Sequence, residues 1–348
     1  MINSIPEVDV LAIGDISINR VREEWNIVMT TLADMPFKIN SYSPTLEEKK
    51  ILLFCDKIKR DDSCILIIVV FQGKSARQIT LAASTVHKPC IIWAMDDRYA
   101  LPSSALGAGA LEELGCQFIL MHSQAEKIEN ALVEFKSVVL VSYGIKMLEK
   151  SRIGAIGQPH FNLISAYYNP ITIRRRFGAW VVPIAISTIK KLYKYIKQEK
   201  VNEIIKKISS DTDVEVERTV IEKAARLQVA FEEVVDKYLL DAVAIDCWNE
   251  ILPEFEVTPC LGFVRDRFVL SCEGDVVCAL GALFARAISG SLTYAGDIFQ
   301  LDEETGVFSS LHCGASISLH SGKDKIRVIA QEPPSTLCAT GKVVVCQP

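Results

Sequence analysis

The sequence has no apolar stretch long enough to cross a lipid bilayer. Its longest strongly apolar runs, Cys64–Phe71 and Phe177–Ile186, are much shorter than the roughly 20 residues that a transmembrane helix needs. The first residues also lack the basic segment and apolar core of a secretory signal. We therefore expect a soluble, cytoplasmic protein with no membrane partner.

Closely spaced cysteine pairs are also missing. The chain has 11 cysteines, an odd number, and no Cys-x-x-Cys pair occurs among them. Several of them, such as Cys64, Cys90 and Cys278, lie in apolar runs, where a free cysteine behaves as a small buried hydrophobic residue. This usage predicts reduced thiols in the cytoplasm and argues against a disulfide framework.

The charge pattern does not predict a broad positive surface. The formal net charge is −5 with both signs interspersed, so we expect no nucleic-acid partner. The densest basic runs are Arg174–Arg176 and the lysines of Lys190–Lys207, and the second run alternates with apolar residues as on one amphipathic helix. The length of 348 residues and the 49% hydrophobic content predict an ordered chain of two or three domains.

Residues 1–150 carry the pattern of an α/β domain. Val8–Gly14 is a buried strand that ends in a glycine turn. Further apolar runs rich in β-branched residues follow at Cys64–Phe71, Pro89–Ala94 and Gln117–Met121, with helical stretches between them. This alternation predicts a flavodoxin-like or Rossmann-like parallel sheet covered by helices.

Two glycine-containing loops of this domain do not match nucleotide-binding motifs. Gly73-Lys74-Ser75 lacks the earlier glycine of a phosphate-binding loop, because Ile68 stands at that position. The Gly107–Gly109 segment has Glu112 where a dinucleotide-binding loop needs its third glycine. A nicotinamide-dependent enzyme is therefore not expected.

The α/β pattern restarts after residue 150 and predicts a second domain over residues 151–290. Strands are expected at Ile153–Gly157, Trp180–Ile184 and Asp241–Asp246. The third strand delivers Cys247–Glu250 beyond its carboxyl end, which is where open α/β sheets place their ligands.

Short segments separated by turn residues make up residues 291–348. They predict a small antiparallel β domain, and an incomplete one. The expected strands are Leu292–Ile298, Val307–Leu311, Ile317–His320, Ile326–Ala330 and Lys342–Cys346.

Acidic residues and a histidine recur beside apolar sequence in the second half of the chain. Glu250 follows a predicted strand, Glu273 and Asp275 precede the apolar helical stretch Val276–Ile288, and His312 comes later. Two carboxylates and an imidazole could bind a divalent metal. A helix cap accounts equally well for either Glu273 or Asp275, because negative groups are favoured at a helix N-terminus.

These segments resemble the active-site segments of the L-fucose isomerase family, which includes the more distant L-arabinose isomerases. The matching segments are Asp246–Glu250, Cys272–Asp275 and His312–Gly314. The resemblance also extends to the order of the domains. It implies that Glu250, Asp275 and His312 hold a manganese ion, for which Mg²⁺ or Co²⁺ could substitute. It further implies that Glu250 and Asp275 transfer the proton of the reaction.

The activity that this resemblance implies is the interconversion of an open-chain aldose and ketose through a cis-enediolate. The further residues expected to contact the monosaccharide are Gln72, Trp93, His160, Trp248 and Glu273. A homo-oligomer, trimer or hexamer, is expected because in the family a neighbouring subunit's first domain helps to shape the pocket. Family members are longer than this chain, so a catalytically impaired sugar-binding or regulatory protein on the same scaffold is the alternative.

Overall fold

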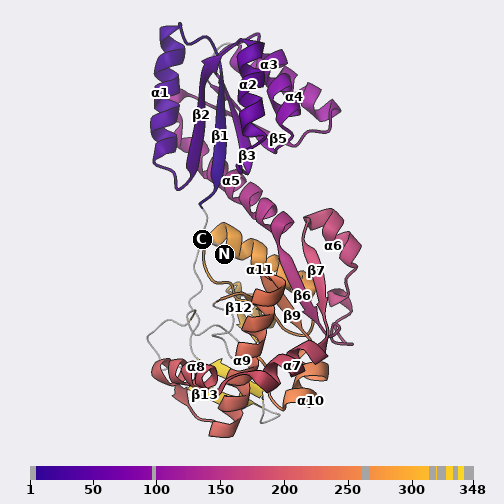
Figure 1. Ribbon diagram of the computed structural model, residues 1–348. Helices are drawn as coiled ribbons and strands as arrows, with labels where there is room; N and C mark the ends of the chain where they lie inside the picture. The colour runs from indigo at the N-terminus through magenta and orange to yellow at the C-terminus, as the bar shows by residue number, and fades with distance from the viewer. Residues whose placement is uncertain are drawn as a thin grey trace. The chain divides into compact units, whose positions relative to one another are not determined.

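The strands of this α/β chain form two parallel sheets and two smaller sheets built on antiparallel pairs, as the sequence predicts (Figure 1). The computed structural model describes residues 5–95, 99–260, 267–312, 319, 327–331 and 336–340. The chain divides into two compact units, Asn3–Lys146 and a second that consists mainly of Met147–Pro348. Within the described residues, no helix is both long and apolar enough to cross a membrane.

The first unit is built on a five-stranded parallel sheet with the order β2-β1-β3-β4-β5. Its strands are β1 (Glu7–Ile13), β2 (Lys38–Thr45), β3 (Ile65–Val70), β4 (Cys90–Met95) and β5 (Phe118–Ser123). Its helices are α1 (Asn19–Ala33), α2 (Glu48–Ile58), α3 (Ala76–Val86), α4 (Ala100–Glu113), the short η1 (Ala125–Lys127) and α5 (Glu129–Lys150), which continues into the second unit. The strand order is that of the flavodoxin-like fold.

Helices cover both faces of this first sheet. One face packs against α2, α3 and α4 through side chains such as Ile51, Ile79 and Leu111. On the other face, the ring of Trp93 lies 5.5 Å from the ring of Phe135, which α5 supplies. Because β3 and β4 are covered on both sides, all their residues are buried, and this explains their unbroken apolar sequences.

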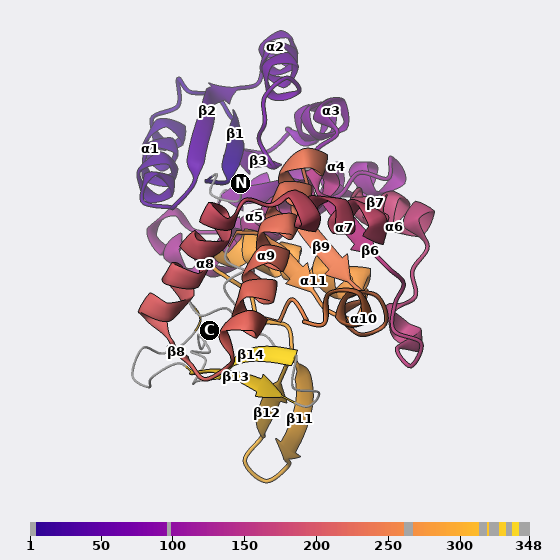
Figure 2. The same ribbon diagram turned by 60° about the horizontal axis from the view of Figure 1, so that its bottom comes forward.

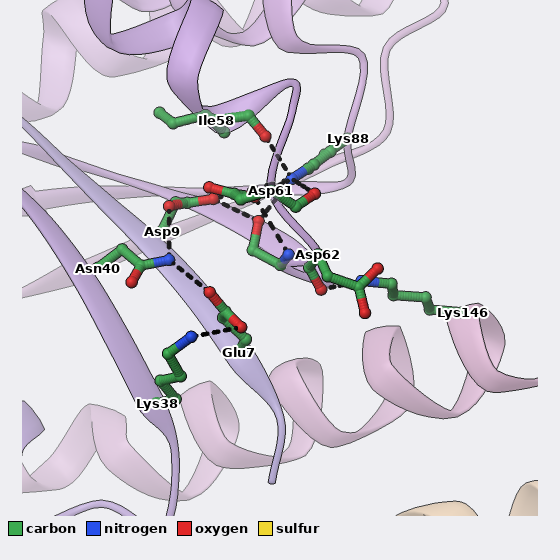
Figure 3. A network of polar contacts seen from close by, with 10 residues as sticks. Glu7, Asp9, Lys38, Asn40, Ile58, Asp61, Asp62, Lys88 and Lys146 are labelled. Atoms are coloured by element: carbon green, nitrogen blue, oxygen red, sulfur yellow. Dashed lines mark hydrogen bonds and ion pairs between the residues drawn. The ribbon is translucent and has the colours of Figure 1, made fainter. Parts of the chain in front are cut away.

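A polar network joins the amino ends of strands β1 to β4 (Figure 3). The fully buried Asp9 accepts hydrogen bonds from Ser63 Oγ and, at 3.3 Å, from Asn40 Nδ2. Lys88 Nζ donates to Asp61 Oδ1 at 2.7 Å and lies 3.8 Å from Asp9 Oδ2. Burial raises the pKa of Asp9 to about 6. Since ligands of such sheets bind at the carboxyl ends, we interpret this network as structural.

The second unit contains a four-stranded parallel sheet with the order β10-β9-β6-β7. Its strands are β6 (Arg152–Ile156), β7 (Trp180–Ile184), β9 (Ala242–Ile245) and β10 (Val269–Ser271). Its helices are η2 (Ile164–Ala166), α6 (Pro170–Phe177), α7 (Ile186–Tyr195), α8 (Gln198–Asp211), α9 (Arg218–Tyr238), the π-helical turn η3 (Cys247–Ile251), α10 (Leu252–Phe255) and α11 (Val276–Ser289). The core between this sheet and α7, α8 and α9 contains Phe231, whereas α11 contributes Leu283 to the core on the opposite face.

The single amphipathic helix expected over the lysine-rich run is two helices. The chain turns between α7 and α8 at Ile196 and Lys197, which both have extended backbone. The turn buries Ile196, while α8 buries Val201 in the core shared with α9. Neither proline nor glycine marks this break, so the sequence alone gave no local signal for it.

Two small sheets complete the second unit (Figure 2). β11 (Asp297–Asp302) and β12 (Val307–Leu311) form an antiparallel hairpin, and β13 (Arg327–Gln331) pairs antiparallel with β14 (Thr336–Thr340). β8 (Asp213–Val214) adds to β13 in parallel. The strand expected at 342–346, and all of that expected at 317–320 except residue 319, lie outside the described residues.

Candidate active site at the carboxyl edge of the second sheet

Three segments that follow strands of the second sheet are joined by backbone hydrogen bonds. The N–H of Asp246, directly after β9, donates to the carbonyl oxygen of Ile156 at the end of β6, at 2.8 Å. The N–H of Gly274, after β10, donates to Ile245 O at 2.9 Å. These bonds bring the segments after β6, β9 and β10 to one edge of the sheet, as the parallel strand directions require.

Glu250 lies at this edge on the π-helical turn η3. Asp246 caps the turn, because its Oδ1 accepts a hydrogen bond from the N–H of Asn249 at 2.9 Å. Asp246 is buried, whereas Glu250 is half-buried and therefore accessible to a ligand. Single-turn π-helices occur frequently at functional sites.

Gly157 makes room for the Glu250 side chain. Its φ is +79°, and a Cβ at this position would lie 2.6 Å from Asp246 Cβ and 2.9 Å from Glu250 Cγ. Only glycine therefore fits between the end of β6 and the two acidic side chains. The sequence marked Gly157 as a strand exit, but its close approach to Glu250 depends on the tertiary structure.

Asp275 is the N-cap of α11. Its Oδ1 accepts a hydrogen bond from the N–H of Cys278 at 2.8 Å. The cap satisfies an otherwise unpaired donor at the helix end and places a negative charge at the positive end of the helix dipole. Of the two acidic residues that the sequence offered for this role, Asp275 is the one that performs it.

Glu273 has an unusual backbone conformation at the same edge. Its φ is +59° and that of Gly274 is +71°, so two successive residues are left-handed. For a residue other than glycine this conformation costs on the order of 1–3 kcal/mol, and such strain clusters at functional sites. Gly274 is required here because a Cβ would lie 2.6 Å from the carbonyl oxygen of Gln158.

The carboxylate of Glu273 interacts electrostatically with two histidines. Burial raises the pKa of Glu273, while His312 and His160 act in the opposite direction, and Cys272 and Asp297 add to the increase. The carbonyl oxygen of Glu273 also accepts the N–H of His160 at 2.9 Å. The backbone bond therefore places Glu273 beside His160, and His312 lies within electrostatic range of the Glu273 carboxylate.

His160 and Trp248, both predicted to contact the sugar, also belong to this part of the unit. The His160 ring stacks on Phe161 with 4.5 Å between centroids, and its Nδ1 accepts the N–H of Asn162 at 3.3 Å. Trp248 is half-buried on η3, next to Glu250 in the sequence. Cys313 and Gly314, which follow His312 in the matched segment, lie outside the described residues.

The two predicted sugar-contacting residues of the first unit each form a side-chain hydrogen bond within that unit. Trp93 is fully buried, and its Nε1 donates to Ser123 Oγ at 2.8 Å. This placement in the core gives the ring no surface for a sugar, so the structure does not support the predicted contact. Gln72 is half-buried after β3, and its Oε1 accepts the N–H of Asp15 at 2.8 Å.

The metal-ligand set that the resemblance implies, Glu250, Asp275 and His312, stays a prediction. Among the residues that the structure describes, no group of three His, Cys, Asp or Glu side chains is placed to hold a metal ion. Glu250, Asp275 and His312 have the right chemistry for Mn²⁺, which accepts carboxylate and imidazole ligands.

The chain is distantly similar to curated sugar isomerases, and no protein-family model matches it. Sulfoquinovose isomerases from Priestia aryabhattai and Priestia megaterium are each 22% identical to it over 203 residues, which is 57% of this chain and 45% of either relative. The sulfoquinovose isomerase of Alkalicoccus urumqiensis is 28% identical over 99 residues, or 27% of this chain and 22% of the relative. The chain thus spans less than half the length of the relatives it matches.

Proposed function

We propose that this chain is an aldose–ketose isomerase of the L-fucose isomerase type that acts on an open-chain monosaccharide. The observation that carries the proposal is the half-buried Glu250 at the carboxyl edge of the second sheet, where its side chain lies against Gly157. The distant similarity to sulfoquinovose isomerases supports the same class of reaction independently of this geometry.

The reaction moves a carbon-bound proton from C2 of the aldose to C1. Glu250 takes the proton from C2, which leaves a cis-enediolate, and then returns it to C1, while the hydroxyl proton of O2 passes to O1. Asp275 is the second proposed proton carrier. Its Oδ1 stays with the helix cap, so we assign proton transfer to Oδ2.

Manganese is the proposed cofactor, with Mg²⁺ or Co²⁺ as substitutes. Glu250, Asp275 and His312 would hold the ion, which as a Lewis acid would stabilise negative charge on the two sugar oxygens. Glu273, His160 and Trp248 lie in the same part of the unit and would orient the sugar hydroxyls. A carboxyl group such as that of Glu273 can accept a hydrogen bond from a sugar hydroxyl.

A panel of aldoses tests the proposal. Sulfoquinovose leads the panel because the relatives are named for it, and L-fucose and L-arabinose follow from the sequence resemblance. We expect one of them to be converted to its ketose, with loss of turnover after chelation and recovery on adding Mn²⁺. No ketose from any member, with manganese bound, would contradict the proposal.

A catalytically impaired sugar-binding or regulatory protein is the second candidate. The bond between Asp275 Oδ1 and the Cys278 N–H favours it, because this bond gives Asp275 a role without any metal. The two candidates differ in a direct measurement. A binding protein retains its affinity for the sugar after chelation and forms no ketose, whereas the isomerase forms ketose only with metal.

We further propose that the working form is a homo-oligomer, a trimer or a hexamer.

A further inference from the structure

The edge strand β5 of the first sheet lacks the usual protection against pairing with another strand. Among the described strands it bonds to β4 alone. Edge strands are normally protected by charged side chains, proline or a β-bulge. The described strand Phe118–Ser123 contains no Asp, Glu, Lys, Arg or Pro, and its register with β4 runs without a bulge.

Alternate backbone groups of β5 point away from the sheet. The N–H of Cys90 in β4 donates to Gln117 O at 3.0 Å, and Cys90 lies opposite Phe118. In a parallel ladder, a residue of one strand bonds to the two neighbours of the residue opposite it. Phe118 and Leu120, which lie opposite bonded residues of β4, therefore direct their own N–H and C=O groups towards the outer edge.

Apolar side chains flank this edge. Ile119 and Leu120 of β5 are 38% and 37% exposed, and Val141 and Ile145 of the neighbouring α5 are 44% and 45% exposed. A groove of about 350 Å³ separates β5 from α5, and Ile119, Val141 and Ile145 line it together with Val138. All residues that line the groove are uncharged.

We propose that β5 and α5 form a two-fold interface between two copies of this chain, with the two β5 strands paired antiparallel about an axis near Leu120. Such pairing would join the two first-unit sheets into one continuous sheet. It would also bring Val141 and Ile145 of each copy against the apolar flank of the other.

A second copy of this chain is the occupant that the surface fits best. A two-fold axis places a surface against itself, so a charged patch would repel its own image. The groove has no charged residue, and His122 is the one titratable side chain of β5. An edge strand also matches an identical strand through backbone hydrogen bonds, whatever its side chains. Of the two assemblies proposed above, a two-fold contact is compatible with the hexamer and incompatible with an isolated trimer. The inference does not depend on the proposed isomerase activity.

Two substitutions on different elements test the interface in the full chain. Leu120→Lys places a charge on the edge strand, and Ile145→Lys places one on α5, where the sheet's own hydrogen bonds are not involved. Leu52→Lys on α2, where Leu52 is 41% exposed, is the matched control. Circular dichroism first establishes that each variant is folded.

Sedimentation velocity over a range of concentrations is the measurement. We expect an even-numbered oligomer for the unsubstituted chain and for Leu52→Lys, and at least about tenfold weaker association for the two interface variants. Hydrogen exchange of the Leu120 amide should be slow in the oligomer and fast in Ile145→Lys. A monomeric unsubstituted chain, an odd-numbered assembly, or association unchanged in both interface variants would overturn the proposal.

Discussion

At the residue scale, Glu250 and its contact with Gly157 carry the proposed chemistry. Glu250 is half-buried, so it can meet a sugar, while the glycine lets its side chain lie directly against the end of β6. A general base must be held within hydrogen-bond reach of the proton that it removes. The position of this carboxylate is therefore set by a residue from another part of the sequence.

We expect Glu250→Gln to lower turnover by at least about a hundredfold, because the amide preserves the size of the group but cannot accept a proton. Glu254→Gln is the control, since Glu254 lies close by in the sequence and its Oε2 pairs with Lys190 Nζ at 2.6 Å. Steady-state kinetics with manganese-loaded protein measures both variants. Near-normal turnover of Glu250→Gln would show that Glu250 is a structural residue.

Gly157→Ala should reduce both activity and stability. The added Cβ meets Asp246 and Glu250, and the positive φ is unfavourable for alanine, so we expect a loss of about 1–3 kcal/mol in the free energy of unfolding. In Gly281→Ala the new Cβ meets no atom within 4 Å, and the helical position should gain about 0.5–1 kcal/mol. Urea unfolding compares the two variants. Equal stabilities would contradict the proposed packing of Gly157.

Residue roles could be predicted only where local sequence determines them. Asp275 before an apolar helix was a recognisable cap candidate, and the structure places it there. Trp93 was expected to contact the sugar from the family resemblance, whereas the structure buries it and its indole N–H donates to Ser123. The backbone bond between His160 and Glu273 joins distant segments, and the spacing of these residues in the sequence does not predict it.

At the scale of elements, the N-cap residue of helix α11, Asp275, is also a proposed metal ligand. Asparagine caps a helix about as well as aspartate, whereas alanine does not. Asp275→Asn should therefore keep the thermal stability and lose manganese, while Asp275→Ala should lose manganese and also about 1 kcal/mol of stability. His312→Ala should lose manganese with little change in stability.

Metal analysis and thermal unfolding of the same three preparations separate the two roles of Asp275. Undiminished manganese stoichiometry in both Asp275→Asn and His312→Ala would exclude them as ligands. Equal stability of Asp275→Asn and Asp275→Ala would show instead that the cap contributes nothing to α11.

The polar network at the amino ends of strands β1 to β4 predicts a pH dependence of stability. The pKa of Asp9 is raised from 3.8 to about 6 in the folded chain, so its contribution is fully present below pH 3.8 and is lost as the pH rises through about 6. Asp61, whose pKa is lowered mainly by its hydrogen bond from Lys88 against the opposing effect of burial, contributes in the opposite direction. We expect Asp9→Asn to remove the fall in stability between these two pH values.

Urea unfolding from pH 4 to 7, followed by a probe in the first unit, measures this effect. Asp34→Asn, at the exposed C-terminal end of α1, is the control and should keep the pH dependence of the unsubstituted chain. A pH profile that is the same with and without the Asp9 carboxylate would contradict the assignment of the raised pKa to Asp9.

Helices and strands could be predicted from the sequence where one hydrophobic pattern dominates a segment. The apolar runs of β3 and β4 identify buried strands, because a strand covered on both faces has no polar side. The two-residue strand β8 could not be foreseen, since its partner β13 lies far along the chain and nothing local requires the pairing. The break between α7 and α8 is set in the same way by packing against α9.

At the scale of the whole molecule, each of the two units has a distinct proposed role. The second unit supplies the carboxyl edge with Glu250 and its neighbours, and the first unit supplies the β5 surface proposed to join two copies. The alternation of strands and helices was sufficient to predict the α/β class. The assembly of copies depends on surfaces that composition does not describe.

Isomerisation in deuterium oxide tests the central claim most directly. The manganese-loaded chain is incubated with the aldose panel, and nuclear magnetic resonance follows the sugar carbons. We expect a ketose that carries deuterium at C1, because a proton held by Glu250 exchanges with solvent before it returns, and at least about a hundredfold slower formation of this ketose with Glu250→Gln. Recovery of every aldose unchanged and unlabelled, with manganese bound, would contradict the claim that this edge of the sheet is an isomerase active site.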